Sequence, residues 1–398
     1  MTTVLRAGGL VAAGTSGGPA PGWVAIDGGL LVETGSGPGP RDAVDLGDAL
    51  LAPGLIDLQV NGLDGVDVGT AEPEAIVELA SALAARGVTA FAPTATSRPL
   101  GEYPGWLDRL AAARRRAAAR DGSGDATAAL LGAHLEGPFL GAARGAHPAD
   151  ALRPADLAWT RSLLDAYPDA VAMVTVAPEA DPGAALIAML ADRGVTVALG
   201  HSRATFSAAT DAAAAGATVV THLFNGMGPL HHREPGLAGA ALADARLTPT
   251  VIADLVHVHP AVLGVVFSAK ATVALVSDVV ATTAGPAVGA RTALHARAVG
   301  GAARLADGTL AGTTVTLERA MANVVGLGVP VDRAIAMATT VPAALLGLTD
   351  RGRLAPGTRA DLVAVDPRDA AVRAVWLGGM PVRARDGRLG HGSSGVSR

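Results

Sequence analysis

Eight short runs of apolar and β-branched residues alternate with alanine-rich segments between residues 55 and 277. The runs have the length and composition of buried strands, and the segments between them have helical spacing. Glu72–Arg86 and Ala180–Arg193 are two of the predicted helices, and Gly87 and Gly194 suit their C-terminal caps. Strands that alternate with helices pair in parallel and are buried on both faces. The predicted strands are Leu55–Gln59, Val88–Pro93, Leu130–Leu135, Val171–Ala177, Val195–Gly200, Thr218–Thr221, Thr250–Ala253 and Thr272–Ser277.

Two parallel α/β folds fit this alternation, a (β/α)8 TIM-like barrel of about 250 residues and a doubly wound open sheet. The positions of the polar residues distinguish the two folds, because each of these residues ends or follows a predicted strand. In a closed barrel the strand ends converge on one rim, whereas in an open sheet they spread along a line. Convergence of residue types that bind metals favours the barrel. These residues are Gln59, Asn61, Glu136, His201, His222, His257 and Asp278.

The two ends of the chain have a different pattern, with short strand-like runs between Gly- and Pro-rich turns. Thr3–Leu5, Trp23–Ile26 and Leu30–Val32 lie at one end, and Ala360–Val365 and Ala374–Leu377 lie at the other. We therefore predict a small β-sandwich domain built from residues 1–52 and 355–398. Residues 53–354 then form the barrel.

Composition excludes several classes of protein. The 398 residues are 50% hydrophobic and contain no cysteine, which excludes disordered chains, disulfide scaffolds and thiolate metal sites. A net charge of −5 and 3% aromatic residues argue against nucleic-acid binding. No apolar run approaches the roughly 18–20 residues of a membrane span, and no secretory signal is recognisable. We expect a cytoplasmic protein that binds neither nucleic acid nor membrane.

Glu136, His201 and His222 each follow a predicted strand, so a closed barrel brings them to one rim. Two imidazoles and a carboxylate with an open fourth position are the usual ligands of a hydrolytic zinc ion, although some iron sites use the same set. Asp278 ends the eighth strand. It is either a helix N-cap or a general base that takes a proton from activated water.

Six motifs occur in an order typical of one family. They are Pro53–Gly62 with Gln59 and Asn61, His134–Pro138, Gly200–Ser202, Thr221–Met227, Arg233–Gly236 and Ser277-Asp278. Together they resemble the N-acetylglucosamine-6-phosphate deacetylase family of the amidohydrolase superfamily. The resemblance covers about residues 50–355 and extends through Gly352–Asp366.

The resemblance implies the deacetylation of N-acetylglucosamine 6-phosphate, a site assignment and a homodimer. Glu136, His201 and His222 correspond to the metal ligands, and Asp278 corresponds to the catalytic acid/base. Arg233 suits the phosphate because guanidinium offers a bidentate fork. The residues that correspond to the sugar-phosphate site, with His147 also placed to polarise the acetamide carbonyl, are Ala146, His147, Asn225, Gly226, Arg233, His257, Leu310, Ala311 and Gly312.

Gln59 and Asn61 are a departure, because most of the superfamily has His-x-His there. Neutral amides are poor zinc ligands, so these residues are expected to contact water or to mark the remains of a second metal site. The pattern predicts one divalent ion, with zinc favoured over iron, cobalt or manganese. Lys270, the only lysine, lies before strand eight and cannot bridge a metal pair from the fourth strand.

Two other functions fit the same residues. One is deacetylation of another N-acyl hexosamine phosphate, such as the galactosamine isomer. The sequence does not separate the two sugars, because they differ in the orientation of one hydroxyl group, which depends on loop side chains for recognition. The other is a non-catalytic sugar-phosphate sensor, although a sensor does not need the base that Asp278 would supply.

Overall fold

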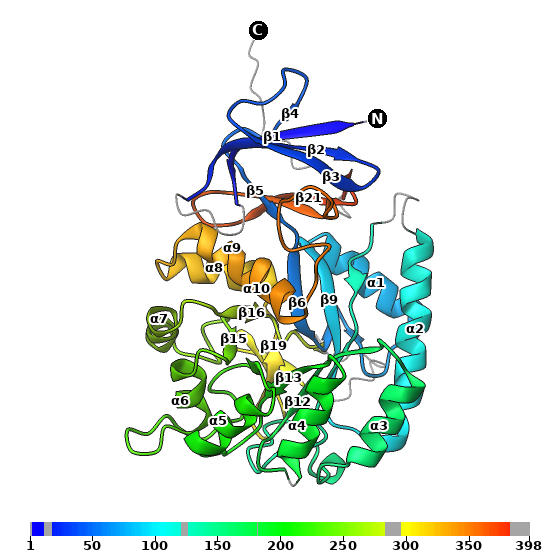
Figure 1. The fold of residues 1–398 in the computed structure, drawn as a ribbon, viewed down its shortest axis with the longest axis vertical. Coiled ribbons are helices and arrows are strands. Elements are labelled where there is room, and N and C mark those ends of the chain that lie inside the picture. The colour runs from blue at the N-terminus through cyan, green and yellow to red at the C-terminus, as the bar shows by residue number, and fades with distance from the viewer. Residues whose placement is uncertain (1, 12–17, 121–125, 181, 283–295, 383–398) are drawn as a thin grey trace.

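The computed structural model describes residues 2–11, 18–120, 126–180, 182–282 and 296–382, which form a helix-covered barrel and a smaller β-sheet domain (Figure 1). The eight barrel strands are parallel and pair in chain order. They are β6 (Leu55–Val60), β9 (Val88–Ala95), β11 (Ala133–Glu136), β12 (Val171–Val176), β13 (Thr196–Leu199), β14 (Val219–Val220), β15 (Thr248–Ile252) and β16 (Ala274–Val276).

The barrel closes between its last and first strands, just beyond β16. The backbone N–H of Asp278 donates to the Gln59 carbonyl at 3.0 Å, and Val60 forms a parallel bridge with Val279. Every residue of β6 and β9 is buried, as expected for strands covered on both faces. The predicted closed barrel is therefore confirmed. The third predicted strand is divided into β10 (Ala129–Leu130) and β11.

Helices cover the outside of the barrel and also its N-terminal end (Figure 1). The predicted helices appear as α1 (Pro73–Ala84) and α4 (Gly183–Asp192), and Gly87 and Gly194 have positive φ as their caps require. The others are α2 (Tyr103–Arg120), α3 (Leu157–Ala166), α5 (Phe206–Ala214), α6 (Gly236–Ala243), α7 (Pro260–Ala269), α8 (Leu317–Gly326), α9 (Val331–Ala338) and α10 (Thr340–Leu345). Ala343 of α10 packs with the apolar side chains inside the barrel, which closes that end.

Both ends of the chain contribute to one small β-domain, as predicted, and the strands of this domain form one sheet. Its strands are β1 (Thr3–Leu10), β2 (Ala20–Asp27), β3 (Leu30–Ser36), β4 (Val44–Asp45), β5 (Leu50–Pro53), β20 (Leu362–Val365), β21 (Val372–Leu377) and β22 (Met380–Pro381). The sheet curls around its own core, which includes Val24, Leu31, Leu51 and Trp376, and the Leu31 N–H donates to the Thr358 carbonyl. The exact domain boundaries stay a prediction, and residues 383–398 lie outside the described residues.

Three further short strands form an antiparallel sheet that follows the barrel's last strand in the chain. They are β17 (Arg297–Val299), β18 (Ala302–Arg304) and β19 (Leu310–Thr313). The Thr313 N–H donates to the Asp278 carbonyl at 2.9 Å, which ties this sheet to the barrel rim. A two-stranded ribbon of β7 (Gly62–Leu63) and β8 (Val66–Asp67) follows β6.

Candidate active site

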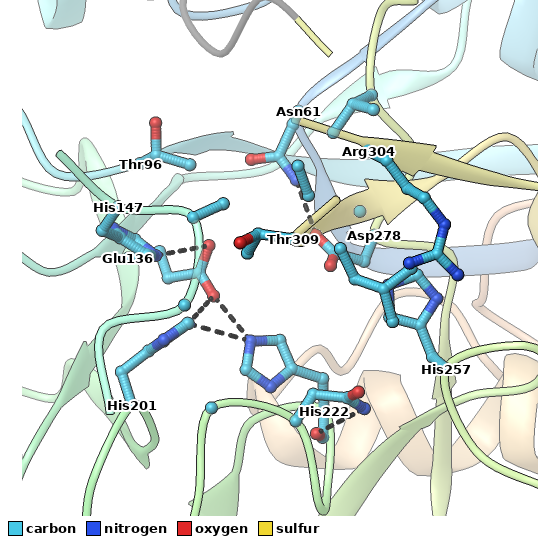
Figure 2. Close-up of a pocket in the computed structure, with 18 of the residues that line it drawn as sticks. Asn61, Thr96, Glu136, His147, His201, His222, His257, Asp278, Arg304 and Thr309 are labelled. Atoms are coloured by element: carbon cyan, nitrogen blue, oxygen red, sulfur yellow. Dashed lines mark hydrogen bonds and ion pairs between the residues drawn. The ribbon is translucent and has the colours of Figure 1, made fainter. Parts of the chain in front are cut away.

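A cavity of about 450 Å³ opens at the C-terminal ends of the barrel strands (Figure 2). This is the end at which barrel enzymes place their catalytic residues. All the site residues predicted from the sequence line this cavity except Gln59 and Arg233. Those present are Asn61, Glu136, Ala146, His147, His201, His222, Asn225, Gly226, His257, Asp278, Leu310, Ala311 and Gly312.

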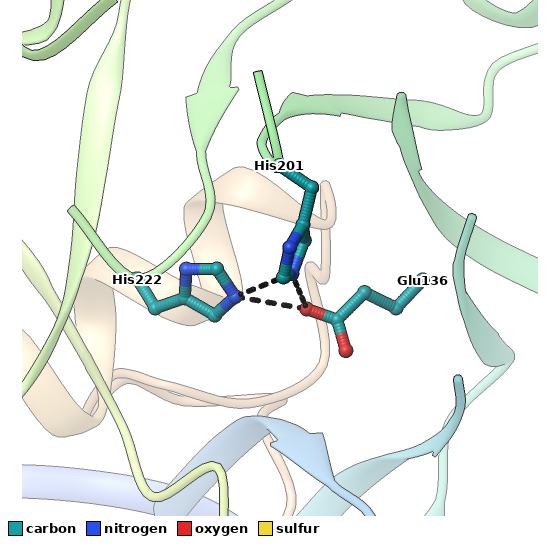
Figure 3. A group of neighbouring side chains, drawn as sticks. All are labelled: Glu136, His201 and His222. Atoms are coloured by element: carbon teal, nitrogen blue, oxygen red, sulfur yellow. Dashed lines mark hydrogen bonds and ion pairs between the residues drawn. The ribbon is translucent and has the colours of Figure 1, made fainter. Parts of the chain in front are cut away.

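Glu136, His201 and His222 point three ligand atoms at one another (Figure 3). The Glu136 Oε1 atom lies 3.1 Å from His201 Nε2 and 2.9 Å from His222 Nε2, and the two nitrogens are 3.1 Å apart. All three side chains are buried. Burial alone would raise the pKa of Glu136, but the two histidines beside its carboxylate hold that pKa well below its usual range.

The hydrogen bonds around His201 show that this cluster suits a cation. His201 Nδ1 lies 3.2 Å from the Ala143 carbonyl, which only accepts, so Nδ1 carries a proton. In the neutral ring Nε2 then presents a lone pair to the carboxylate of Glu136 and to the second imidazole. Electron pairs converging in a buried space require a shared proton or a metal ion, and two histidines with one carboxylate are a common metal-binding set.

His201, His222 and Asp278 all adopt positive φ angles, at 49°, 31° and 50°. This left-handed conformation is unusual outside glycine and persists where surrounding contacts impose it. The Thr250 hydroxyl accepts from the His222 N–H at 2.7 Å, and Gln59 and Thr313 hold the backbone of Asp278. The sharp bend after each strand turns the side chain into the cavity.

Asp278 is buried and is held by two amides. Its Oδ1 atom accepts from Asn61 Nδ2 at 2.7 Å and from Gln59 Nε2 at 3.1 Å, and Gln59 Nε2 also donates to Glu136 at 3.0 Å. Burial and the nearby charge of Glu136 raise the pKa of Asp278 to about 8. Gln59 and Asn61 therefore turn their N–H groups toward carboxylates, and they orient Asp278.

This chain resembles known proteins of one family. The model of the amidohydrolase family matches residues 50–382. This chain belongs to the amidohydrolase family. An N-acetylgalactosamine-6-phosphate deacetylase of Escherichia coli O157:H7 is 36% identical over 86% of this chain and 90% of its own length. An N-acetylglucosamine-6-phosphate deacetylase of Danio rerio is 36% identical over 85% of this chain and 86% of its own length.

Solved structures resemble the whole of this amidohydrolase. A mutant of the Mycobacterium smegmatis N-acetyl-D-glucosamine-6-phosphate deacetylase was solved in complex with N-acetyl-D-glucosamine 6-phosphate. It aligns with a TM-score of 0.85 and 34% identity, covering 96% of this chain and 99% of that one. The Thermotoga maritima enzyme aligns with a TM-score of 0.80 and 31% identity, covering 96% and 99%. The barrel architecture is that of these deacetylases.

Family membership and the buried cluster together indicate a divalent metal ion in this amidohydrolase. Lys270 lies just after α7, where its Nζ donates to the Asp244 carbonyl, so it does not line the cavity. Within the described ranges, no helix has the length and apolar character needed to cross a membrane.

In two other histidines of this amidohydrolase, Nδ1 is hydrogen-bonded within the protein, which determines the role of Nε2. His147 Nδ1 accepts from the Ser97 backbone N–H at 3.1 Å, so the neutral ring carries its proton on Nε2. Burial and the neighbouring His201 lower the pKa of His147 to about 3, which keeps the ring neutral. His257 Nδ1 lies 2.6 Å from an oxygen of Asp254, which leaves Nε2 for other partners.

The cavity also contains residues that the sequence did not single out, notably Thr96, Arg304 and Thr309 (Figure 2). Arg304 ends β18, and its Nη1 donates to the Gly308 carbonyl at 2.9 Å. Thr96 directly follows β9, so the strand-end rule that found the metal cluster applies to it as well, whereas Arg304 and Thr309 lie beyond that rule. Arg304 and Thr309 belong to the β17–β19 region, which lies outside the repeating β/α pattern.

Arg233 is exposed in the loop before α6 and does not line the cavity of its own chain.

Proposed function

We propose that this amidohydrolase removes acetate from N-acetyl-D-glucosamine 6-phosphate and leaves D-glucosamine 6-phosphate. One observation carries the proposal: the Glu136/His201/His222 cluster and the buried Asp278 face the same cavity. A cation site beside a carboxylate suits hydrolysis of an amide. The relatives' names supply the sugar phosphate as the substrate class.

Glu136, His201 and His222 would hold one divalent ion, and zinc suits three nitrogen and oxygen ligands with an open fourth position. Iron, cobalt and manganese bind the same donors. A cation in this position supplies a Lewis acid that acidifies water and polarises the amide carbonyl. Gln59 and Asn61 are not ligands in this proposal, since both direct N–H groups at carboxylates.

Asp278 takes a proton from the attacking water as the new carbon–oxygen bond forms. It then delivers the proton to the nitrogen as the carbon–nitrogen bond breaks. A metal ion at the cluster would oppose the effect of the Glu136 charge on the pKa of Asp278. Asp278 would therefore ionise more readily when the metal is bound. His147 Nε2–H lies 3.7 Å from Oε2 of Glu136 at the edge of the cavity, where it can donate to the amide oxygen and stabilise the developing oxyanion.

The sugar phosphate would extend from the cluster toward Arg304 and His257, which lie on the opposite side of the cavity (Figure 2). A guanidinium binds a phosphate dianion well. Asn225 and Gly226 line the cavity next to His222 and His201, and Ala146 packs with Ala311 of the Leu310–Gly312 segment, which also lines it. These residues are proposed to contact the substrate.

Replacing Arg304 with Met is expected to raise KM for the sugar phosphate about 10- to 100-fold with a smaller change in kcat. One charge-assisted hydrogen bond contributes about 1.5–3 kcal/mol, and Arg304 lies away from the reacting amide. Initial-rate measurements over a range of substrate concentrations test this. Arg297→Met is the matched control, because Arg297 lies opposite Arg304 in the β17–β18 pair but does not line the cavity. An unchanged KM for Arg304→Met would contradict the proposed phosphate position.

We also propose a homodimer in which Arg233 reaches the cavity of the neighbouring subunit. Leu230, three residues earlier, is 49% exposed, and α7 beside α6 exposes Val265 to 57%. Mixed dimers test this directly. Arg233→Met and Asp278→Asn homodimers are each expected to be weakly active, whereas co-refolded mixtures should recover activity, since one site of each hybrid has both residues. Monomers in light scattering, or no recovery, would contradict this arrangement.

The galactosamine isomer is the second candidate substrate, because one relative carries that name. Acetate release from both N-acetylated hexosamine 6-phosphates, together with metal quantification of the purified protein, tests the proposal. We expect one divalent ion per subunit and higher kcat/KM for the glucosamine substrate. A higher value for the galactosamine substrate would reverse the assignment, and absence of acetate release in the metal-loaded protein would favour a sugar-phosphate sensor. A cytoplasmic location and the absence of nucleic-acid binding stay predictions.

A further inference from the structure

The active-site cavity has a narrow side opening that leads toward a second cavity. The opening has a volume of about 10 Å³, which is room for about one water molecule, and the second cavity has a volume of about 630 Å³. Asn61, Thr96 and Val280 line both the opening and the active-site cavity. Among the described residues, Thr96 is the one that lines all three spaces, so it lies where they meet. We call the opening the side passage.

The side passage lies beside the residues that are proposed to act on the amide. Asn61 Nδ2 donates to Oδ1 of Asp278 at 2.7 Å. Ser97, the residue after Thr96, donates its backbone N–H to Nδ1 of His147 at 3.1 Å. The passage is therefore bordered by the immediate neighbours of the proposed base and of the proposed oxyanion donor.

The far side of the cavity is available to the sugar. Thr96 lies on the left of the site in Figure 2, and Arg304 and His257 lie on its right. A secondary amide is planar and trans, so its acyl chain and the carbon on its nitrogen point to opposite sides of the C–N bond. With the sugar directed toward Arg304 and His257, the acyl group is directed toward Thr96 and the side passage.

The walls of the side passage differ in how firmly they are held. Asn61 is fixed by its hydrogen bond to Asp278, and the hydroxyl of Thr94 bonds to two backbone groups of the barrel. Val280 is 7% exposed and packs against alanines of the β17–β19 sheet. Thr96 is only partly buried, and no hydrogen bond joins its hydroxyl to another described residue. Thr96 is thus the part of the wall that can change size without breaking a bond of the site.

We propose that Thr96 limits the acyl group that this amidohydrolase removes to acetyl, by closing the side passage to longer chains. This specificity rests on the proposed function, which supplies the N-acyl sugar phosphate and its direction in the cavity. The methyl of an acetyl group ends before the passage. The last two carbons of a butanoyl chain would have to enter a space that holds one water molecule, and such overpacking is costly.

Initial rates of the metal-loaded enzyme with the N-acetyl, N-propanoyl and N-butanoyl forms of glucosamine 6-phosphate test this. For the wild type we expect kcat/KM to be about 10- to 100-fold lower for the butanoyl than for the acetyl substrate, with propanoyl between them. Thr96→Ala removes as many heavy atoms as butanoyl adds to acetyl, so it should raise the butanoyl-to-acetyl ratio about tenfold or more. Thr96→Val is the matched control, because valine keeps the shape of threonine without its hydroxyl, and it should keep the wild-type ratio. If Thr96→Ala does not fold, Val280→Ala decides the matter, because it widens another wall of the same passage.

Equal kcat/KM for the acetyl and butanoyl substrates in the wild type, or an unchanged ratio in Thr96→Ala, would overturn the proposal. An equal rise in Thr96→Val would also overturn it, because the hydroxyl rather than the size of the side chain would then discriminate.

Calorimetric binding of the same three compounds to metal-loaded Asp278→Asn, with and without Thr96→Ala, separates this proposal from the proposed function. Dissociation constants that rise with acyl length, and fall for butanoyl when Thr96→Ala is added, support the passage even if the wild type releases no acid. Acetate release by the wild type without this dependence on acyl length rejects the passage and leaves the proposed function intact. Absence of both binding and acid release rejects the two together.

Discussion

Asp278→Asn is expected to lower kcat for acetate release by about 10²- to 10⁴-fold, the usual contribution of a general acid/base. The asparagine oxygen still accepts a hydrogen bond from Asn61 or Gln59, but it cannot take a proton from water. Metal content is expected to stay at the wild-type value, because Asp278 is not one of the three clustered ligands. The measurements are kcat by acetate release and metal per subunit by elemental analysis.

The matched control for this substitution is Asp57→Asn. Asp57 is also buried at this end of the barrel, where it accepts from the Gln59 and Ser277 N–H groups at 3.2 Å, but it does not line the cavity. We expect its kcat to fall by less than tenfold, which would show that loss of a buried carboxylate is not itself inactivating. Near-normal turnover of Asp278→Asn would remove Asp278 from catalysis and leave it as a structural residue. The helix N-cap considered from the sequence is already wrong, since no helix begins there.

The metal cluster was predictable because barrel geometry converts positions in the sequence into positions in space. Glu136, His201 and His222 are separated by 65 and 21 residues along the chain, yet each ends or follows a parallel strand. Closure of the sheet then brings strand ends to one rim. The repeating β/α pattern therefore predicted both the fold and the convergence of these residues.

Other features depend on local geometry that periodicity does not encode. Arg304 enters the cavity from a short antiparallel strand, so no strand-end rule points to it. The positive φ of His201 and His222 arises from contacts across the rim. Arg233 was expected beside the substrate, but it is exposed in the loop before α6. Within one subunit it does not line the active-site cavity.

The orientation of the amides is a further example. Gln59 and Asn61 were expected to contact water or mark a lost metal site, and the sequence could not show which atoms they present. The structure turns both N–H groups toward the carboxylates of Asp278 and Glu136. A histidine at either position would bring another ring toward these carboxylates. The amides thus form a network that orients the Asp278 carboxylate.

Replacing His222 with Asn is expected to weaken divalent-metal binding by at least about 100-fold and to abolish measurable turnover. Structural zinc sites with four ligands bind with about 10–16 kcal/mol, so one ligand accounts for roughly 2.5–4 kcal/mol, or about 10²- to 10³-fold. The shorter amide cannot bring a nitrogen lone pair to the position of His222 Nε2. Metal per subunit after dialysis against a weak chelator measures the loss.

Thermal unfolding separates loss of the metal from loss of the fold. Zinc that binds only the folded wild type should raise its Tm as the logarithm of the zinc concentration increases, whereas His222→Asn should show little rise. His231→Asn is the matched control, because His231 is exposed and lies outside the cavity. The histidine rings of this cluster crowd one carboxylate oxygen, so the metal-free variant is expected to fold as well as the metal-free wild type. Full metal content in His222→Asn would show that the ion is held by other side chains and would refute the three-ligand site.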